Sequence, residues 1–337
     1  MSKCLPKAIG GYFELELPLQ RKQLYPNAMG FQSARAAFYA LLTEGKPSRV
    51  WMPKYICDAM LDPLKVAETE IVFYDLDSGL GVPNDVQIKD SDWLLYVNYF
   101  GVCATQEDKL LKRFNPSQLI FDHSQAFFSP PGDCLATIYS PRKFFGVPDG
   151  GLLLTSLDVM VPEEIDTGSM ARCTHLLKRL DNTPEAGYQD YNNAEETFCD
   201  IQPRRQSLLT NRLLISIDYD ACKKQRNANF NYIHDQFNHL NELYFDTSRI
   251  DGPMCYPLLI DDATIRERLL ANRIFVPIYW TEVGRRVNPS SFERYLLDKC
   301  LPIPCDQRYM QEDLMRIIEL VNSFFTYRGK TEKSQHE

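Results

Sequence analysis

The sequence predicts an α/β protein with a mostly parallel central sheet, helices on both faces, and a small C-terminal α+β domain. Short apolar runs alternate with segments of helical periodicity over the first half of the chain, which is typical of βαβ units. Several of these runs end in polar residues, and the pattern loses its regularity after residue 156. A chain of 337 residues has the length of one large and one smaller domain. We therefore expect a large domain over residues 1–235, a small domain over 236–330 and a tail over 331–337.

Each expected element rests on its local pattern of apolar residues. Ser33 can cap the first helix, whose apolar face includes Phe38 and Leu41. The expected strands span residues 9–18, 49–52, 70–74, 93–97, 119–121, 135–139, the apolar run that Gly150 and Gly151 open, 254–260 and 275–279. The expected helices span residues 33–43, 56–67, 107–114, 170–180, 207–217, 219–240, 263–272 and 311–325. Residues 156–206 otherwise show little pattern, which favours a functional excursion, an interface or a lid.

The composition is ordinary for a globular protein, with 44% hydrophobic and 24% charged residues. A net charge of −8 argues against a broad nucleic-acid-binding surface, which needs a basic face, but leaves room for a local basic pocket. The ten cysteines show no CxxC pair and no metal-ligand spacing, a pattern typical of reduced, buried thiols. The chain opens without the apolar core of a secretory signal and has no run of membrane-spanning length. We expect a cytoplasmic protein without metal or membrane contacts.

Two apolar runs, 119–121 and 135–139, are followed by polar groups. Asp122 and Gln125 follow the first run, and Ser140 and Lys143 follow the second. Ligands of α/β sheets bind beyond the carboxyl ends of the strands, so an acid, an amide and an amine presented there together indicate a site.

Lys143 has two interpretations. A loop lysine is most often a solvated surface charge. The functional interpretation is a Schiff-base lysine, which is activated by a neighbouring cation or by burial. Arg142 could supply the first effect, and Phe144 with Phe145 the second.

Asp122 is a common cap or turn residue on its own, and His123 a structural hydrogen-bonding group. The functional interpretation of Asp122 is the carboxylate that keeps a pyridine nitrogen protonated, so that the ring acts as an electron sink. A catalytic triad on Ser124 or Ser140 is disfavoured, because neither lies in a G-x-S-x-G elbow. Ser33 is either a plain N-cap or a group that presents its hydroxyl and the following amides to a phosphate. The nucleotide-binding patterns G-x-x-x-x-G-K-[ST] and G-x-G-x-x-G are absent.

Together, these segments resemble the DegT/DnrJ/StrS family of pyridoxal-phosphate (PLP) enzymes, the sugar aminotransferases of fold type I. The family's acid-x-x-Gln motif appears here as the segment from Asp122 to Gln125. A segment similar to S-F-x-P-x-K followed by G-x-G-G appears as Tyr139 to Lys143 and Asp149 to Gly151. Weaker likenesses to P-x-Y-x, H-L-Y-G and L-P-I-x begin at Pro53, Asn98 and Leu301.

The resemblance implies PLP as the cofactor and a role for each matched residue. Lys143 would form the Schiff base and move a proton, and Asp122 would pair with the pyridinium nitrogen. The other implied cofactor-binding residues would hold the 3′-oxygen, the phosphate or the ring: Gln125, Ser124, Ser140, Ser33, Ala34, Arg35, Tyr55 and Cys57. The implied reaction moves an amino group from a donor, commonly glutamate, to a keto-sugar nucleotide, and the family site is shared between the two chains of a homodimer.

Four departures from the family pattern leave the substrate open. The family's S-G-T at the phosphate helix ends here in Arg35, so a charge replaces a hydroxyl. The aromatic residue that usually stacks on the ring falls on Cys57, with Tyr55 as a substitute, and the histidine of H-L-Y-G is Asn98. The G-x-N-x-R-M segment, which sends an asparagine across the dimer interface, has no clean counterpart. The candidate stand-ins are Asn192, Asn193, Arg204 and Arg205.

Two other functions stay open at this point. A PLP-dependent dehydratase or lyase on the same fold is suggested by Asn98 and Cys57. Sugar dehydratases of the family replace the lysine with histidine, so Lys143 favours transamination. A non-catalytic regulator or scaffold is suggested by the altered phosphate helix and the missing asparagine, whereas the retained Lys143 and Asp122 argue against it.

Overall fold

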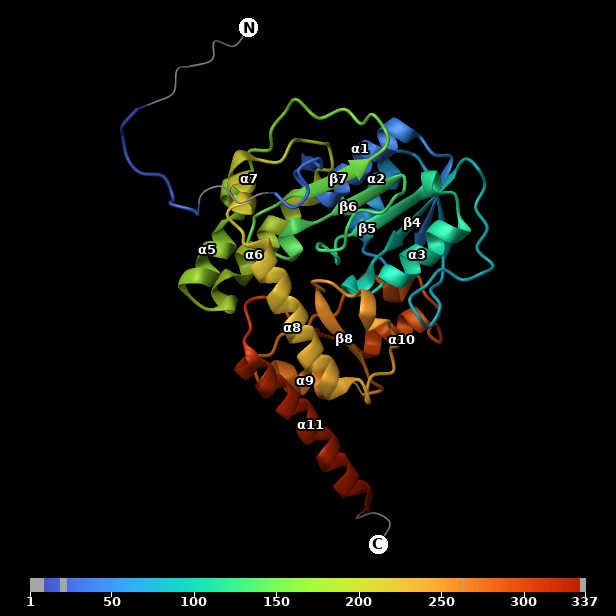
Figure 1. The fold of residues 1–337 in the computed structure, drawn as a ribbon, viewed down its shortest axis with the longest axis vertical. Helices are drawn as coiled ribbons and strands as arrows, with labels where there is room; N and C mark the ends of the chain where they lie inside the picture. Colours follow the sequence, from blue (N-terminus) through green and yellow to red (C-terminus); the bar gives the residue numbers. More distant parts are fainter. Residues whose placement is uncertain (1–8, 19–22, 263, 334–337) are drawn as a thin grey trace.

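The computed structural model describes residues 9–18, 23–262 and 264–333 (Figure 1). A seven-stranded sheet forms its largest part, in the order β1-β7-β6-β5-β4-β2-β3. The strands are β1 (Met29–Phe31), β2 (Arg49–Pro53), β3 (Glu70–Tyr74), β4 (Asp92–Val97), β5 (Leu119–His123), β6 (Ala136–Tyr139) and β7 (Gly151–Thr155). Strands β2 to β6 pair in parallel, and β7 pairs antiparallel with both β6 and β1. The expected mostly parallel sheet is confirmed.

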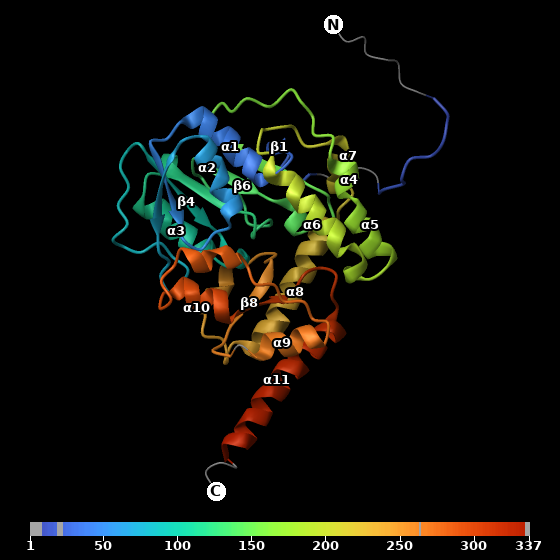
Figure 2. The same cartoon turned by 180° about the vertical axis from the view of Figure 1, so that it is seen from behind.

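Helices cover both faces of this sheet. Figures 1 and 2 show α1 (Ala34–Gly45) and α2 (Asp62–Val66) on one face and α3 (Ala104–Arg113) on the other. Every residue of β4, β5 and β6 is buried, as expected for strands with apolar layers on both sides. The expected strand boundaries agree with the structure to within about two residues for β2 to β6, because each strand is a compact apolar run.

The C-terminal part of the chain folds beside the carboxyl edge of the sheet (Figure 1). It contains the antiparallel pair β8 (Cys255–Leu259) and β9 (Cys300–Pro304). Its helices are α8 (Tyr219–Phe237), α9 (Thr264–Ala271), α10 (Phe292–Lys299) and α11 (Gln311–Lys333). The expected domain boundary at residue 236 falls in the last turn of α8, and the division into two domains stays a prediction.

Residues 169–199 form a helical cap at the same edge of the sheet. The cap contains α4 (Ser169–Arg172), α5 (Thr174–Asp181) and α6 (Tyr188–Glu196), and α7 (Leu208–Ile215) follows it. Short 3₁₀ helices complete the fold: η1 (Asp58–Met60), η2 (Tyr99–Gly101), η3 (Pro116–Gln118), η4 (Pro141–Lys143), η5 (Pro184–Gly187), η6 (Thr197–Cys199), η7 (Thr247–Arg249) and η8 (Thr281–Arg285). Residues 156–206 are therefore more helical than their pattern indicated.

Two expected strands are wrong. Residues 275–279 run without strand pairing, because β8 pairs along its whole length with β9 instead. Residues 9–18 alternate like a strand, but they lie exposed and unpaired; Tyr12 and Phe13 are 99% and 93% exposed. A strand needs a partner for its backbone groups, and an alternating pattern does not specify one. The strands β1 and β9 and the helices α6 and α10 were missed.

The last expected helix and the expected tail also differ from the structure. Helix α11 runs to Lys333, beyond the expected end at residue 325 and into the expected tail. Residues 334–337 and Ala263, where one helix was expected to begin, lie outside the described residues, as do residues 1–8 at the opening of the chain.

The described residues can be compared with the expectations about membrane spans, metal ligands and cysteines. None of the helices found there is long and apolar enough to cross a membrane. Within the same ranges, no group of three or more histidine, cysteine, aspartate or glutamate side chains is arranged to hold a metal ion. The cysteines from Cys57 to Cys305 are all free thiols.

Candidate active site

The carboxyl ends of β1, β2, β4, β5 and β6 meet at one edge of the sheet, because these strands run in the same direction. The residues that follow them are Ser33, the segment from Lys54 to Cys57, Asn98, Asp122 and Ser140. Such an edge gathers loops and helix N-termini, so it is the place where an α/β sheet builds a ligand site. The cap and the C-terminal part border this edge (Figures 1 and 2).

Asp122 lies near the end of β5 with 3% of its surface exposed. Its Oδ1 accepts a hydrogen bond of 2.8 Å from the backbone N–H of Ser124, which fixes the carboxylate in place. Its backbone carbonyl accepts a bond from the N–H of Asn98, so the ends of β4 and β5 are held together. A buried carboxylate held in one orientation suits a partner that carries a positive charge.

Gln125 lies one turn further along and is 1% exposed. Its Oε1 accepts a bond of 2.7 Å from the backbone N–H of Phe100. Phe100 has a positive φ of 58°, a conformation that a phenylalanine rarely adopts, and this bond helps to hold it. Because the amide oxygen is used in this way, the amide nitrogen is the end of Gln125 that can donate to a ligand.

Lys143 ends η4, directly after β6, and its side chain is exposed at the site edge. Phe144 and Phe145 beside it are buried. The carbonyl of Phe144 accepts hydrogen bonds from Arg226 (3.2 Å) and Gln307 (2.9 Å). Arg226 comes from α8 and is 1% exposed, so a buried guanidinium holds the loop that carries Lys143.

The N-terminus of α1 faces the same edge. Ser33 is the N-cap, as expected, and its Oγ accepts a bond of 3.2 Å from the N–H of Ala36. The amides of Ala34 and Arg35 belong to the first turn, where backbone N–H groups have no acceptor within the helix. Gly151 packs tightly against this turn: a Cβ on it would lie 2.2 Å from the carbonyl carbon of Ser33. The glycine therefore lets β7 approach the helix start.

Cys57 follows β2 at this edge of the sheet. Burial raises the pKa of its thiol, the positive charge of Lys143 lowers it, the carboxylate of Asp122 raises it, and Arg35 lowers it. Asp122 lies near the end of β5, Lys143 follows β6, and Arg35 lies in the helix that follows β1. Because these strands run in the same direction, their ends bring these expected site residues to one edge of the sheet.

Tyr55 and Ser140 are placed differently from Cys57. Tyr55 is 2% exposed, and its ring lies 5.0 Å from the ring of Trp280 and 5.7 Å from that of Tyr99. This aromatic cluster joins β2 to the C-terminal part of the chain. Ser140 follows β6 with 4% exposure, and its carbonyl accepts a hydrogen bond from the N–H of Lys143. Roles of Tyr55, Ser140 and Ser124 in holding a cofactor stay predictions.

Asn98 and His123 support the site without facing Lys143. The Nδ2 of Asn98 donates to Glu107 Oε1 (3.0 Å), and His123 Nε2 lies 2.7 Å from the same oxygen. The Oδ1 of Asn98 accepts the backbone N–H of Cys103 (3.0 Å). These three buried side chains connect β4, β5 and α3, which is a structural role.

The cap contacts the site through Glu195 at the end of α6. Both of its carboxylate oxygens accept hydrogen bonds from Arg142, one of them at 2.9 Å. Burial alone would raise the pKa of Glu195, but the bonds and charge of Arg142, with the charges of Arg35 and Lys143, hold the pKa below its usual value. Arg35 Nη1 also donates to the carbonyl of Phe198 (3.0 Å). The segment over residues 156–206, expected to be a functional excursion, an interface or a lid, therefore contacts Arg142 and Arg35.

A buried ionic network anchors the other end of the cap. Arg172 of α4 donates to Asp166 (2.6 Å) and Asp149 (3.1 Å), and Asp149 also accepts the Thr210 hydroxyl at 2.5 Å. Asp149 is fully buried. Sequence reasoning placed Asp149 in a motif but missed Arg172, Glu195 and Phe198, because their partners lie far along the chain and no local pattern marks them.

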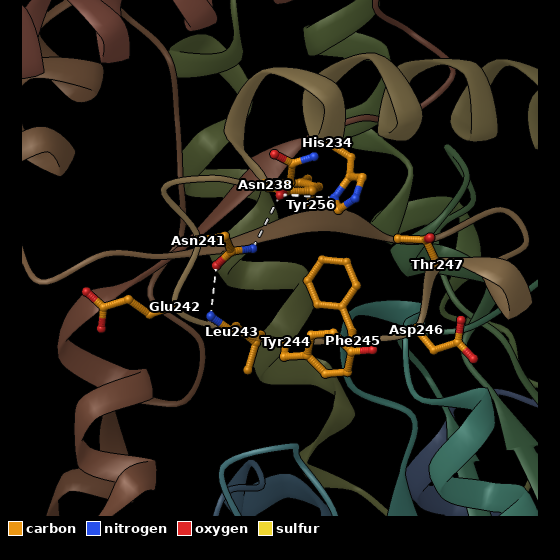
Figure 3. A pocket seen from close by; sticks show the side chains of 10 residues that line it. All are labelled: His234, Asn238, Asn241, Glu242, Leu243, Tyr244, Phe245, Asp246, Thr247 and Tyr256. Atoms are coloured by element: carbon orange, nitrogen blue, oxygen red, sulfur yellow. Dashed lines mark hydrogen bonds between the residues drawn. The ribbon is translucent and has the colours of Figure 1, made fainter.

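A separate hollow of about 380 Å³ lies on the C-terminal part of the chain (Figure 3). Its polar side chains are used by the fold itself. Asn241 donates to the Pro257 carbonyl and accepts from the N–H groups of Leu243 and Leu259. The hollow includes none of the expected site residues, so it is not part of the candidate site. Its lining residues are His234, Asn238, Asn241, Glu242, Leu243, Tyr244, Phe245, Asp246, Thr247 and Tyr256.

Comparison with known proteins identifies the fold of the chain. No family model matches the sequence, and no curated protein matches it. Among solved structures, the apo-form of the sugar aminotransferase Spr1654 from Streptococcus pneumoniae superposes with a TM-score of 0.65 at 15% identity, covering 93% of this chain and 88% of that one. The fold is that of the sugar aminotransferases.

Two further structures agree. DesI, solved in the presence of its TDP-sugar product, gives a TM-score of 0.63 at 18% identity over 92% of this chain and 83% of that one. CalS13 from Micromonospora echinospora gives 0.60 at 15% identity over 88% and 87%. At these identities the likeness establishes the fold alone, and the fold expected from the resemblance is confirmed.

Proposed function

We propose that the chain is a PLP-dependent aminotransferase that moves an amino group from glutamate to a keto-sugar nucleotide. The observation that carries the proposal is that Lys143, Asp122 and the start of α1 with Arg35 lie at the carboxyl ends of β6, β5 and β1, which run in the same direction to one edge of the sheet. An amine, a buried acid and a basic helix N-terminus are the three groups that PLP requires of a protein: one for its aldehyde, one for its ring nitrogen and one for its phosphate.

The residues present fit this cofactor. The first turn of α1, with Ser33, the amides of Ala34 and Arg35 and the Arg35 side chain, would hold the phosphate. Asp122 would hold the ring nitrogen, and the free amide nitrogen of Gln125 would donate to the ring oxygen. When bound, the cofactor would supply an electron sink for the carbon that loses or gains a proton. Lys143 would carry the cofactor and hold or release that proton.

The matching solved structures include the PLP and PMP forms of Spr1654 and DesI in the presence of its TDP-sugar product. The fold shared with these structures supports a nucleotide sugar as the acceptor.

We further infer that the chain forms a homodimer. Exposed apolar side chains on and after the cap offer a surface for a second copy: Met170, Leu177, Leu180 and Leu208. Light scattering on the purified chain tests this inference, and a monomer at micromolar concentration would contradict it.

The function is tested by the absorbance of the purified protein after incubation with PLP. We expect a visible band from the bound cofactor that Lys143→Ala loses, because the substitution removes the amine. Adding glutamate should then convert the band of the wild type to that of the amino form, whereas a dehydratase or lyase would leave it. Lys65→Ala, at an exposed lysine of α2 paired with Asp62, is the matched control and should keep the band. A wild type that takes up no PLP would overturn the proposal.

A further inference from the structure

Glu195 occupies an unusual position for a carboxylate of the chain itself. It is bonded to Arg142 through both oxygens, and the charges of Arg35 and Lys143 also lower the pKa of its carboxyl. The pair is partly accessible, with 20% of the Arg142 side chain and 32% of the Glu195 side chain exposed. It connects the loop of Lys143 to the last turn of α6.

The geometry of this pair is that of a receptor for a carboxylate. A guanidinium and a carboxylate that meet through two parallel N–H···O bonds form a planar fork, which Lys cannot reproduce. The Arg142 guanidinium also lies 4.6 Å from the ring centre of Phe198, which limits the directions that the fork can take. Arg142 is therefore held ready for a planar anion beside Lys143.

We propose that Arg142 binds the α-carboxylate of the amino donor and that Glu195 holds this place until the donor displaces it. This inference rests on the proposed function and adds the receptor for the donor. In an α-amino acid one carbon separates the nitrogen from the carboxylate, so the receptor must lie next to the amine acceptor. Arg142 directly precedes Lys143 in η4, so the two side chains start from Cα atoms about 3.8 Å apart. The diphosphate of a nucleotide sugar lies beyond the sugar ring and needs a more distant receptor.

Displacement of Glu195 also affects the cap. Glu195 lies in the last turn of α6, and Phe198, whose ring and carbonyl contact Arg142 and Arg35, follows it within one turn. When a donor carboxylate takes the Arg142 fork, one of the contacts that hold the cap to the site is lost. Binding of the donor therefore loosens the segment that borders the site edge.

The test is a calorimetric titration of the cofactor-loaded protein with glutarate, which has the two carboxylates of glutamate and no amine to react. Glu195→Gln removes the internal competitor, so glutarate should bind several-fold tighter than to the wild type. Arg142→Gln removes the receptor, so the variant should bind glutarate at least about tenfold more weakly than the wild type does. Glu196→Gln, at the exposed neighbouring position, is the matched control and should bind as the wild type does.

The direction of the Glu195→Gln effect decides the outcome. A glutamate that merely supports the cap would give equal or weaker binding when replaced, and that result would overturn the proposal. So would a gain in affinity for pyrophosphate without a gain for glutarate, because the site would then take a phosphate. If Arg142→Gln fails to fold by circular dichroism, the Glu195→Gln titration still decides. If the chain takes up no PLP, the proposed function fails, while the same titration of the cofactor-free protein still tests the receptor.

Discussion

Arg172 and Arg142 contact the same phenyl ring but differ in what surrounds them. Each guanidinium carbon lies 4.6 Å from the ring centre of Phe198. The Arg172 side chain is 7% exposed and its partners Asp149 and Asp166 are 0% and 5% exposed. The Arg142 and Glu195 side chains are 20% and 32% exposed. The first cluster is closed to solvent, and the second lies at the site edge.

The difference in burial gives the two arginines different functions. A buried charge that loses its partner has no water to replace it, so the Arg172 network resists opening and anchors the cap. A partly exposed pair can exchange one carboxylate for another at little cost. The cap therefore has one permanent attachment to the sheet, at α4, and one exchangeable attachment, at the end of α6.

The largest expected effect is on Arg172. Arg172→Ala leaves the carboxylates of Asp149 and Asp166 buried without their cation, so we expect the free energy of unfolding to fall by about 3–5 kcal/mol. Urea unfolding followed by circular dichroism measures this. Arg204→Ala, which removes exposed pairs with Glu164 and Asp200, is the control and should cost about 0–1 kcal/mol. Equal losses in the free energy of unfolding for the two variants would contradict the distinction between the buried and the exposed ion pairs.

A smaller effect is expected at Phe198, the ring that the two arginines share. Phe198→Leu keeps an apolar side chain but removes the aromatic face, so two cation–π contacts are lost, at about 1–2 kcal/mol in total. Denaturant unfolding gives the value. Tyr188→Leu, at a 64% exposed position of the same cap, should change the free energy of unfolding by less than about 0.5 kcal/mol. A loss at Phe198 no larger than at Tyr188 would mean that the ring does not join the two attachments.

The smallest effect on stability is expected at Glu195, and it depends on pH. The pKa of Glu195 is lowered in the folded protein, so its ionised form adds stability above the ordinary value of 4.5, and this is lost as the pH falls through the folded pKa. At pH 7 we expect Glu195→Gln to cost up to about 1 kcal/mol. The gap between wild type and variant should close as the pH falls below 4.5 and through the lower folded pKa, and unfolding curves measured from pH 7 to well below pH 4.5 test this. Glu196→Gln is the control, and a gap that widens in acid would contradict the assignment.

Much of the sheet and of the site follows from local sequence patterns. Strands β2 to β6 are short apolar runs, and Ser33 has the side chain that starts a helix, so both could be predicted without tertiary contacts. Asp122, Gln125 and Lys143 stand just beyond such runs, and parallel pairing of β5 with β6 then brings them to one edge. The cap was less predictable. The expected helix over residues 170–180 covers most of α4 and α5, but α6 was not expected, because Ala194 is its one buried residue and leaves little signal of packing against the rest of the chain.

The sequence by itself determined which chemical groups this chain presents and at which strand ends, because apolar periodicity and capping act over a few residues. The tertiary structure decided which of these groups meet. Tyr55 and Cys57 are two residues apart, yet the ring of Tyr55 packs against Trp280, whereas the pKa of the Cys57 thiol responds to the charges of Lys143, Asp122 and Arg35. Arg142 and Glu195 are 53 residues apart and form one ion pair. Charge and ring contacts depend on distance in space, and no short-range pattern encodes that distance.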